Sequence, residues 1–391
     1  MLFQTLDNKQ ECYKIFCNDQ LIDDYRGKDL THTWAPSSHI QNPNIEYAQI
    51  WCHGKSLNEV CPDNLSSHWK LVNQKARTFI KTFHNAKINL DDVCFYDLVP
   101  EKFLLEFYDL KNKICKHVFE NYHKPRNYEF LKDLSIFIKE IESRTLNIDQ
   151  EQIDKVVSHL PAAQKLRECG LHVVYNQWRT ATGRLATEKR SFPILTLSKE
   201  LRHVIKPQND LFVELDFNSA ELRVLLGLLD KEQPCEDIHS WISKNIFDCR
   251  YDREETKKKT FAWLYNPKAS NKKLNSYFDR DQIYEKYFLD GFVHTPYGRS
   301  LAVTPDKAVN YLIQSTSSDM LLNSAISINK ELAKTKSFVS FCVHDSIVLD
   351  MSREDRLLIK KLAENFSRTK FGILKTNLSM GKNFGNMRKI S

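Results

Sequence analysis

Two segments with the character of β-strands each lead into an aspartate, and this feature constrains the fold more than any other. Residues 211–217 alternate in polarity as a strand does, and a helical pattern follows, so Asp216 lies where that strand ends. Residues 338–343 and 347–351 have the composition of two more strands, and the turn between them contains Asp345. The sequence therefore predicts a sheet in which two aspartates lie at strand ends.

These aspartates have two explanations. Asp is favoured in turns, so either residue taken alone is more simply a turn residue. Two carboxylates near a pair of Mg²⁺ ions have another use, because one ion can acidify a hydroxyl while both neutralise a phosphate in transfer. Two such turns in one chain, with the residues that flank them, favour the second explanation. We predict that Asp216 and Asp345 hold two Mg²⁺ ions in a nucleotidyl-transfer site.

A basic and aromatic series recurs every four residues in the segment between these aspartates. The series consists of Arg253, Lys257, Phe261 and Tyr265. Residues at this spacing lie on one side of a helix, and one interpretation of that side is a face for a nucleoside triphosphate. Cations there would bind phosphate oxygens, and aromatic rings would stack near the base and sugar. The alternative is a solvated lysine-rich face, which we prefer for Lys258 and Lys259.

Composition adds only weak constraints. The 391 residues carry a formal net charge of +7, which is compatible with a polyanionic partner but is also common in other proteins. The first residues lack the pattern of a secretion or transit signal, and no apolar run approaches the length of a membrane span. We therefore expect a soluble, cytoplasmic protein with no membrane partner.

Four segments, in their order along the chain and in their amino-acid sequences, resemble the motifs of family-A DNA polymerases, the group that contains bacterial DNA polymerase I and many phage replicases. The segments are Thr180-Ala181-Thr182-Gly183-Arg184-Leu185, Asp216-Phe217-Asn218-Ser219-Ala220-Glu221-Leu222-Arg223, the series from Arg253 to Tyr265, and His344-Asp345. The resemblance covers roughly residues 100–391. It implies a template-directed DNA polymerase with an α+β, right-hand fold, which has an antiparallel-sheet palm and helical fingers and thumb.

The resemblance also implies a domain organisation. Helical periodicity in residues 101–123 and 128–141 falls where this family has its thumb. The implied parts are a small α/β domain over 1–95, a thumb over 96–150, a palm over 151–230 and 295–391, and fingers over 231–294. The family position of the first part suggests a degenerate 3′–5′ exonuclease, because the Asp-x-Glu pair that such a site requires is absent there.

The resemblance assigns roles to single residues. Lys257 joins the two aspartates in catalysis, and His239 meets the triphosphate. Glu221, with Tyr265, would crowd a ribose 2′-hydroxyl and so select deoxynucleotides. The implied contacts to primer–template DNA come from Arg184, Arg223, Asn310, Gln314 and His344. Asn310 and Gln314 would probe the minor groove, where the acceptors are shared by all correct base pairs.

Two departures from the family pattern leave alternatives open. Ser346 stands where many members have Glu, and His-Asp-Ser also occurs in related single-subunit RNA polymerases. Asn266-Pro267 stands where many members have glycine, at the end of the fingers helix. The alternatives are an RNA polymerase-like enzyme and a catalytically silent primer–template binding protein. Intact Asp216 and Asp345 argue against the silent protein, and Glu221 argues against the RNA polymerase.

The implied partners follow from the resemblance alone. They are primer–template DNA and dNTPs, with a replicative helicase-primase and a single-strand-binding protein as further candidates. A monomeric phage-type replicase, acting in the host cell cytoplasm, is the biological setting that the resemblance suggests.

Overall fold

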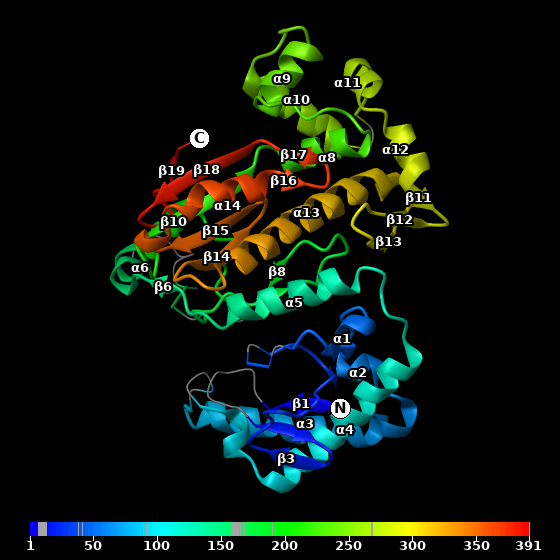
Figure 1. The fold of residues 1–391 in the computed structure, drawn as a ribbon, viewed down its shortest axis with the longest axis vertical. Helices are drawn as coiled ribbons and strands as arrows, with labels where there is room; N and C mark the ends of the chain where they lie inside the picture. The colour runs from blue at the N-terminus through cyan, green and yellow to red at the C-terminus, as the bar shows by residue number, and fades with distance from the viewer. Residues whose placement is uncertain are drawn as a thin grey trace. The chain divides into compact units, whose positions relative to one another are not determined.

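The computed structural model describes residues 1–6, 14–37, 39–40, 42–88, 90, 93–157, 164, 166–167, 169–189, 191–266 and 269–390. The chain forms two compact units, Met1–Ser143 and Arg144–Ser391 (Figure 1). Both units mix helices with strands. The expected α+β class is therefore observed, and each unit is described by itself below.

The N-terminal unit combines short strands with longer helices. Its strands are β1 (Phe3–Thr5), β2 (Ile15–Cys17), β3 (Gln20–Ile22), β4 (His32–Thr33) and β5 (Glu46–Tyr47). Its helices are α1 (Ala48–Trp51), α2 (Leu57–Val60), α3 (Asp63–Asn85), the 3-10 helix η1 (Phe95–Leu98), α4 (Glu101–Asn121) and α5 (Tyr128–Glu142). Strands β1, β2 and β3 form an antiparallel sheet, and β4 and β5 pair in parallel. The two helices expected over 101–123 and 128–141 are thus present as α4 and α5.

Helix α4 belongs to the core of the N-terminal unit. Its apolar stripe, which includes Phe103, Ile114 and Val118, is buried against α3 and the first strands. The Tyr108 hydroxyl donates a hydrogen bond of 2.9 Å to the carbonyl of Leu6. The compact units therefore divide after Ser143, whereas the sequence analysis placed a boundary near residue 95. The periodicity of α4 predicted the helix, but it carries no information on which element the buried stripe would meet.

An antiparallel five-stranded sheet lies at the centre of the C-terminal unit. Its strands are β10 (Leu211–Phe217), β14 (Phe338–Val343), β15 (Ser346–Met351), β18 (Thr376–Gly381) and β19 (Arg388–Lys389). Their order is β14-β15-β10-β18-β19. The expected strand over 211–217 and the expected hairpin around residues 344 and 345 are both confirmed. His344 in the hairpin turn has a φ of 53°, a left-handed conformation that tight turns require.

Helices pack against this sheet. Helices α8 (Ala220–Leu228), α13 (Ala308–Leu332) and α14 (Leu358–Ser367) pack with one another or with the sheet (Figure 1). The Phe217 ring on β10 stacks on Phe366 of α14, with centroids 4.3 Å apart. Because neighbouring side chains on a strand point to opposite faces, Asp216 points away from α14.

Further elements of the C-terminal unit surround this sheet. Short strands and helices precede it: β6 (Asn147–Ile148), α6 (Gln150–Val157), β7 (Tyr175–Asn176), β8 (Ala186–Thr187), η2 (Lys199–Val204) and β9 (Ile205–Lys206). Four helices follow α8: α9 (Ile238–Asn245), α10 (Arg253–Tyr265), α11 (Lys272–Tyr277) and α12 (Arg280–Tyr287). The remaining elements are β11 (Phe288–Leu289), β12 (Phe292–His294), β13 (Ser300–Ala302), η3 (Pro305–Lys307), η4 (Arg353–Asp355), β16 (Arg368–Thr369) and β17 (Gly372–Ile373). Helices thus dominate the segment expected to form the fingers.

Within the described part of the chain, no helix has both the length and the apolar character needed to cross a membrane.

Candidate active site

Strand pairing brings the two predicted aspartates to the same end of the sheet. Asp216, near the end of β10, lies opposite Ser346 in the antiparallel register with β15. Asp345 immediately precedes Ser346, and its carbonyl accepts a hydrogen bond of 3.4 Å from the Phe217 amide. Residues separated by more than a hundred positions in the sequence therefore become neighbours. The structure brings together the pair that the sequence analysis singled out.

Both carboxylates are held without a cationic partner. Burial raises the pKa of Asp216 to about 6, and the charges of Glu214 and Asp345 raise it further, against a hydrogen bond from Asn377. Burial also raises the pKa of Asp345, while the charges of Arg184 and His344 oppose that shift. Neither carboxylate forms an ion pair with any residue that the structure describes. Negative charge in a poorly hydrated position favours either a proton or a cation.

The donor set fits a hard divalent cation. Mg²⁺ prefers oxygen ligands and is often held by one or two carboxylates together with substrate phosphates. The aspartate pair supplies that number, and burial disfavours the charged form of both carboxylates by raising their pKa values. No cluster of three or more His, Cys, Asp or Glu side chains suited to a metal occurs among the described residues. The two aspartates are therefore candidate ligands rather than part of a larger cluster of such side chains.

Two residues beside the aspartates were missed by the sequence analysis. Asn377, opposite Asp216 in the register of β18, donates a hydrogen bond of 2.9 Å from Nδ2 to Asp216 Oδ2. The Ser346 hydroxyl donates a bond of 2.9 Å to Glu214 Oε1 on the neighbouring strand. Glu214 precedes Asp216 by two positions, so the strand alternation could have placed both on one face. Asn377 had no signal in the sequence, because its position depends on the pairing of distant strands.

Helix α10 presents its four-residue series on its open side. Thr256, Thr260, Trp263 and Leu264 form the buried side of the helix. The Phe261 and Tyr265 rings of the series stack with centroids 5.8 Å apart and planes 8° from parallel. Lys257 is exposed and forms no ion pair with another described residue. The geometry expected of this face is therefore observed, and Lys257 is its available cation.

Arg253, in contrast, is bound to carboxylates. Its guanidinium donates to Asp237 through Nε at 3.1 Å and Nη2 at 3.0 Å, and Nη1 contacts Glu254. Asp237 also accepts hydrogen bonds from Asn218 and from the Ser240 amide at the start of α9. Burial raises the pKa of Asp237, but these hydrogen bonds outweigh it and hold the pKa below its usual range. Arg253 therefore ties α10 to the start of α9.

Glu221 lies at the meeting point of three predicted site residues. One carboxylate oxygen accepts from the Tyr265 hydroxyl and the other from the Arg184 guanidinium. Glu221 is buried, and burial raises its pKa to about 7, with Arg184 lowering it and the Asp345 charge raising it. The pair expected to select the sugar is thus in contact, within electrostatic reach of Asp345.

The Arg184 segment is held by a buried ion pair. Arg299 donates to both carboxylate oxygens of Asp319, at 3.0 Å from Nε and 2.7 Å from Nη2. Gly183 has a φ of 75°, and a Cβ atom there would lie 2.5 Å from Cζ of Arg299. The Ser318 hydroxyl donates to the Gly183 carbonyl at 3.1 Å. Only glycine fits this close turn, which orients Arg184 towards Glu221.

The expected contact of Arg223 with DNA is wrong. Arg223 is 0% exposed, and its guanidinium donates to the carbonyls of Asn218, Pro234 and Glu236 and to the Asn218 side chain. All these acceptors belong to the protein and use four of the five N–H donors of the guanidinium, which is fully buried and therefore out of reach of a phosphate. Arg223 instead fixes the turn after β10 to the segment that leads into α9. The family resemblance implied a DNA contact for Arg223, whereas the segment that leads into α9 covers its side chain.

The side chain of His239 is not open to a phosphate in this arrangement. It is 1% exposed, its Nε2 lies 2.8 Å from the Ser219 hydroxyl, and its ring packs against Phe261. Burial lowers its pKa to about 4, so the imidazole is neutral at pH 7. The charges of Arg253 and Lys257 lower that pKa further. The expected triphosphate contact is therefore not met, and His239 supports the aromatic side of α10.

None of the other predicted DNA contacts is fully buried. Asn310 and Gln314 are half-buried and one turn apart on α13. His344 is exposed in the turn next to Asp345. Asn266 follows α10 directly, and Pro267 lies outside the described residues.

Comparisons with known proteins agree with the motif resemblance. No family model matches the chain. Over 260 residues it is 26% identical to the thermostable DNA polymerase I of Thermus aquaticus, a match that covers 53% of this chain and 31% of the relative. The corresponding enzyme of Thermus filiformis is 26% identical over 263 residues, again 53% of this chain and 31% of the relative. The chain thus spans about a third of the length of these relatives.

A solved structure shows the same fold. The chain is similar to the polymerase domain of Pol1 from M. smegmatis, which was solved with a DNA primer-template and a dNTP. The TM-score is 0.60 at 13% identity, and the match covers 72% of this chain and 75% of the other. The resemblance to family-A DNA polymerases and the right-hand α+β fold are therefore confirmed.

Proposed function

We propose that this chain is a template-directed DNA polymerase that adds dNTPs to the 3′-hydroxyl of a primer. The observation that carries the proposal is the meeting of Asp216 and Asp345 without a cationic partner at the end of the sheet. The sequence similarity to DNA polymerase I and the polymerase-domain fold support it. The solved relative binds a primer-template and a dNTP, and we propose the same partners here.

The reaction joins the primer 3′-oxygen to the α-phosphate of the dNTP and breaks the bond to pyrophosphate. Asp216 and Asp345 would hold two Mg²⁺ ions, which on binding would promote loss of the hydroxyl proton and neutralise charge on the transferred phosphate. Lys257 would bind the outer phosphate oxygens, because its ammonium group is exposed and forms no ion pair within the described part of the chain. Arg253 holds α10 against α9. We therefore propose that Arg253 orients the side of α10 that carries Lys257 towards the phosphates.

We propose that Glu221 and Tyr265 select the deoxyribose. The hydroxyl of Tyr265 donates to Glu221, and Phe261 stacks on the Tyr265 ring. This pair, placed beneath the incoming sugar, would collide with the 2′-hydroxyl of a ribonucleotide. A deoxyribonucleotide lacks that hydroxyl and would fit. This contact favours DNA synthesis over the RNA polymerase-like alternative, although Ser346 is shared with that group.

We assign the parts of the hand by the family pattern. Residues 151–230 and 295–391 would form the palm, 231–294 the fingers and 96–150 the thumb. Arg184, Asn310, Gln314 and His344 would contact the primer-template. The finer setting, a monomeric phage replicase in the host cytoplasm with helicase-primase and single-strand-binding partners, rests on the motif resemblance.

Primer extension tests the proposal. We expect the protein to extend a primer on a DNA template with dNTPs and Mg²⁺, and to use NTPs far less well. Initiation of chains from NTPs without a primer would favour the RNA polymerase-like alternative. Binding of the primer-template with no extension under any divalent metal would favour the silent binding protein.

A further inference from the structure

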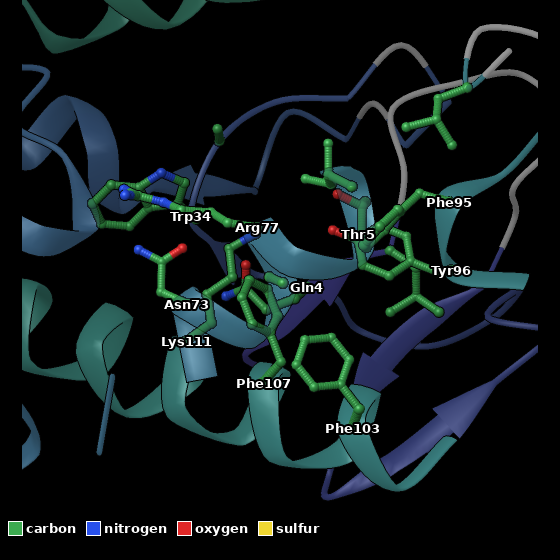
Figure 2. A pocket seen from close by; sticks show the side chains of 15 residues that line it. Gln4, Thr5, Trp34, Asn73, Arg77, Phe95, Tyr96, Phe103, Phe107 and Lys111 are labelled. Carbon is green, nitrogen blue, oxygen red and sulfur yellow. The ribbon is translucent and has the colours of Figure 1, made fainter. Parts of the chain in front are cut away.

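The N-terminal unit contains a cavity of about 500 Å³ that the polymerase reaction does not use (Figure 2). Side chains from β1, α3, η1 and α4 line it. Binding sites for small organic molecules are commonly 300–1,000 Å³ in volume, with apolar walls and a few polar groups. The size and composition of this cavity therefore suit a ligand rather than a single water molecule.

Aromatic rings form much of the wall. Phe103 and Phe107 on α4 lie with their centroids 5.8 Å apart, and Phe95 and Tyr96 on η1 lie 4.8 Å apart. Trp34 borders the cavity on another side (Figure 2). Rings presented to a cavity offer stacking surfaces to a flat, aromatic ligand.

Two cations line the cavity without an anionic partner. Lys111 and Arg77 form no ion pair with another described residue, whereas Lys113, two positions from Lys111, pairs with Asp109 at 2.7 Å. Burial lowers the pKa of Lys111 to about 8, against a smaller opposing influence of the Cys115 thiol. No Asp or Glu occurs among the residues lining the cavity. An anionic ligand would compensate this charge.

A buried carboxamide adds hydrogen-bonding capacity. Gln4 is 0% exposed and lines the cavity, and its Nε2 donates a bond of 3.0 Å to Asn112 Oδ1. Its Oε1 is buried and has no hydrogen-bond partner among the described residues. A buried carbonyl oxygen without a partner favours a ligand that supplies a donor, such as an amino or imino group.

We propose that this cavity binds a single nucleotide unit, with the base against the aromatic rings and the phosphate beside Lys111 and Arg77. A nucleotide combines the three properties that the walls require: a flat ring, an edge with hydrogen-bond donors and an anionic group. The same chemistry has two sources, a free nucleotide and the terminal nucleotide of a single strand. The inference does not rest on the polymerase proposal, because none of these residues belongs to the candidate active site.

Calorimetric titration of the full chain with dAMP, and separately with a six-nucleotide oligo(dA), tests the proposal. Binding of dAMP identifies a free nucleotide as the ligand, and binding of the oligomer alone identifies a strand end. Photolabelling with 8-azido-dAMP, followed by peptide mapping, should mark peptides within residues 73–111. Absence of binding by both probes, or labelling confined to residues 216–265, would overturn the proposal.

Matched variants locate the phosphate. Lys111→Met keeps the length of the side chain but removes its charge, and should weaken dAMP binding about tenfold. Arg77→Gln, at an exposed position where folding is not at risk, should act in the same direction. Lys113→Met is the control and should leave affinity unchanged. Affinity should also fall as the pH rises above about 8, where Lys111 loses its proton. Equal affinities for the Lys111 and Lys113 variants would contradict the assigned contact.

Discussion

The C-terminal unit contains two groups of partly or fully buried charge that differ in their partners. Arg299 and Asp319 satisfy one another through two hydrogen bonds, and Asp319 is 0% exposed. Asp216 and Asp345 lie together at the end of the sheet, and neither forms an ion pair with a residue that the structure describes, although the charges of Arg184 and Lys389 act on them. Burial raises the pKa of Asp319 as it raises those of the other two aspartates, but Arg299 contacts Asp319 directly and opposes that shift, whereas Asp216 and Asp345 are like charges that disfavour one another. We propose that this second group is the one that binds a cation.

The largest effect that this comparison predicts is on catalysis. Asp216→Asn or Asp345→Asn should lower Mg²⁺-dependent primer extension by roughly a thousandfold or more, because each removes a charge that would hold metal. Affinity for the primer-template should change little. Single-turnover incorporation measures the first quantity, and fluorescence anisotropy with labelled DNA measures the second.

Asp290→Asn is the matched control. Asp290 lies in the turn between β11 and β12 with a φ of 50°, which Asn also tolerates, and it is exposed. It represents the turn aspartate that Asp216 and Asp345 would be if they had no catalytic role. If all three Asn variants, at positions 216, 345 and 290, extended a primer nearly as well as the wild type, Asp216 and Asp345 would have no catalytic role.

Breaking the ion pair between Arg299 and Asp319 should lower the stability of the protein. Arg299→Met leaves Asp319 buried without its partner and should lower the free energy of unfolding by about 3–5 kcal/mol. The double variant Arg299→Met with Asp319→Leu should recover most of that loss, because no buried charge remains. Denaturant unfolding measures both. A single variant as stable as the wild type would show that the pair does not support this part of the fold.

The contact between Glu221 and Tyr265 predicts a smaller effect on sugar selection. Glu221→Ala should raise the relative kcat/KM for ribonucleotides on the order of a hundredfold, because it removes the barrier to a 2′-hydroxyl. Insertion of dCTP and CTP opposite template G gives the ratio. Phe261→Leu is the control, and should lower incorporation of both nucleotides without changing their ratio. An unchanged ratio in the Glu221 variant would exclude Glu221 from selection.

Local patterns in the sequence carried much of the fold and the site. Strand alternation located β10 and the hairpin around Asp345, and the four-residue spacing identified the open face of α10. Long-range packing decided the rest. Asn377 reaches Asp216 only through the register of β18, and Arg223 is buried only because the loop before α9 covers it. Periodicity predicts that a residue is on a face, but not what that face meets.

Thermal unfolding of the wild type and Asp216→Asn between pH 4 and pH 8, with and without Mg²⁺, tests the central claim most directly. The pKa of Asp216 is raised to about 6 in the folded protein, so its charge costs stability above that pH and costs nothing below the unfolded value of 3.8. Without Mg²⁺, the Asn variant should be more stable at pH 8 by up to roughly 3 kcal/mol, and the difference should vanish near pH 4. Mg²⁺ should stabilise the wild type and not the variant. Equal stability at all pH values, or equal stabilisation of both proteins by Mg²⁺, would contradict the account.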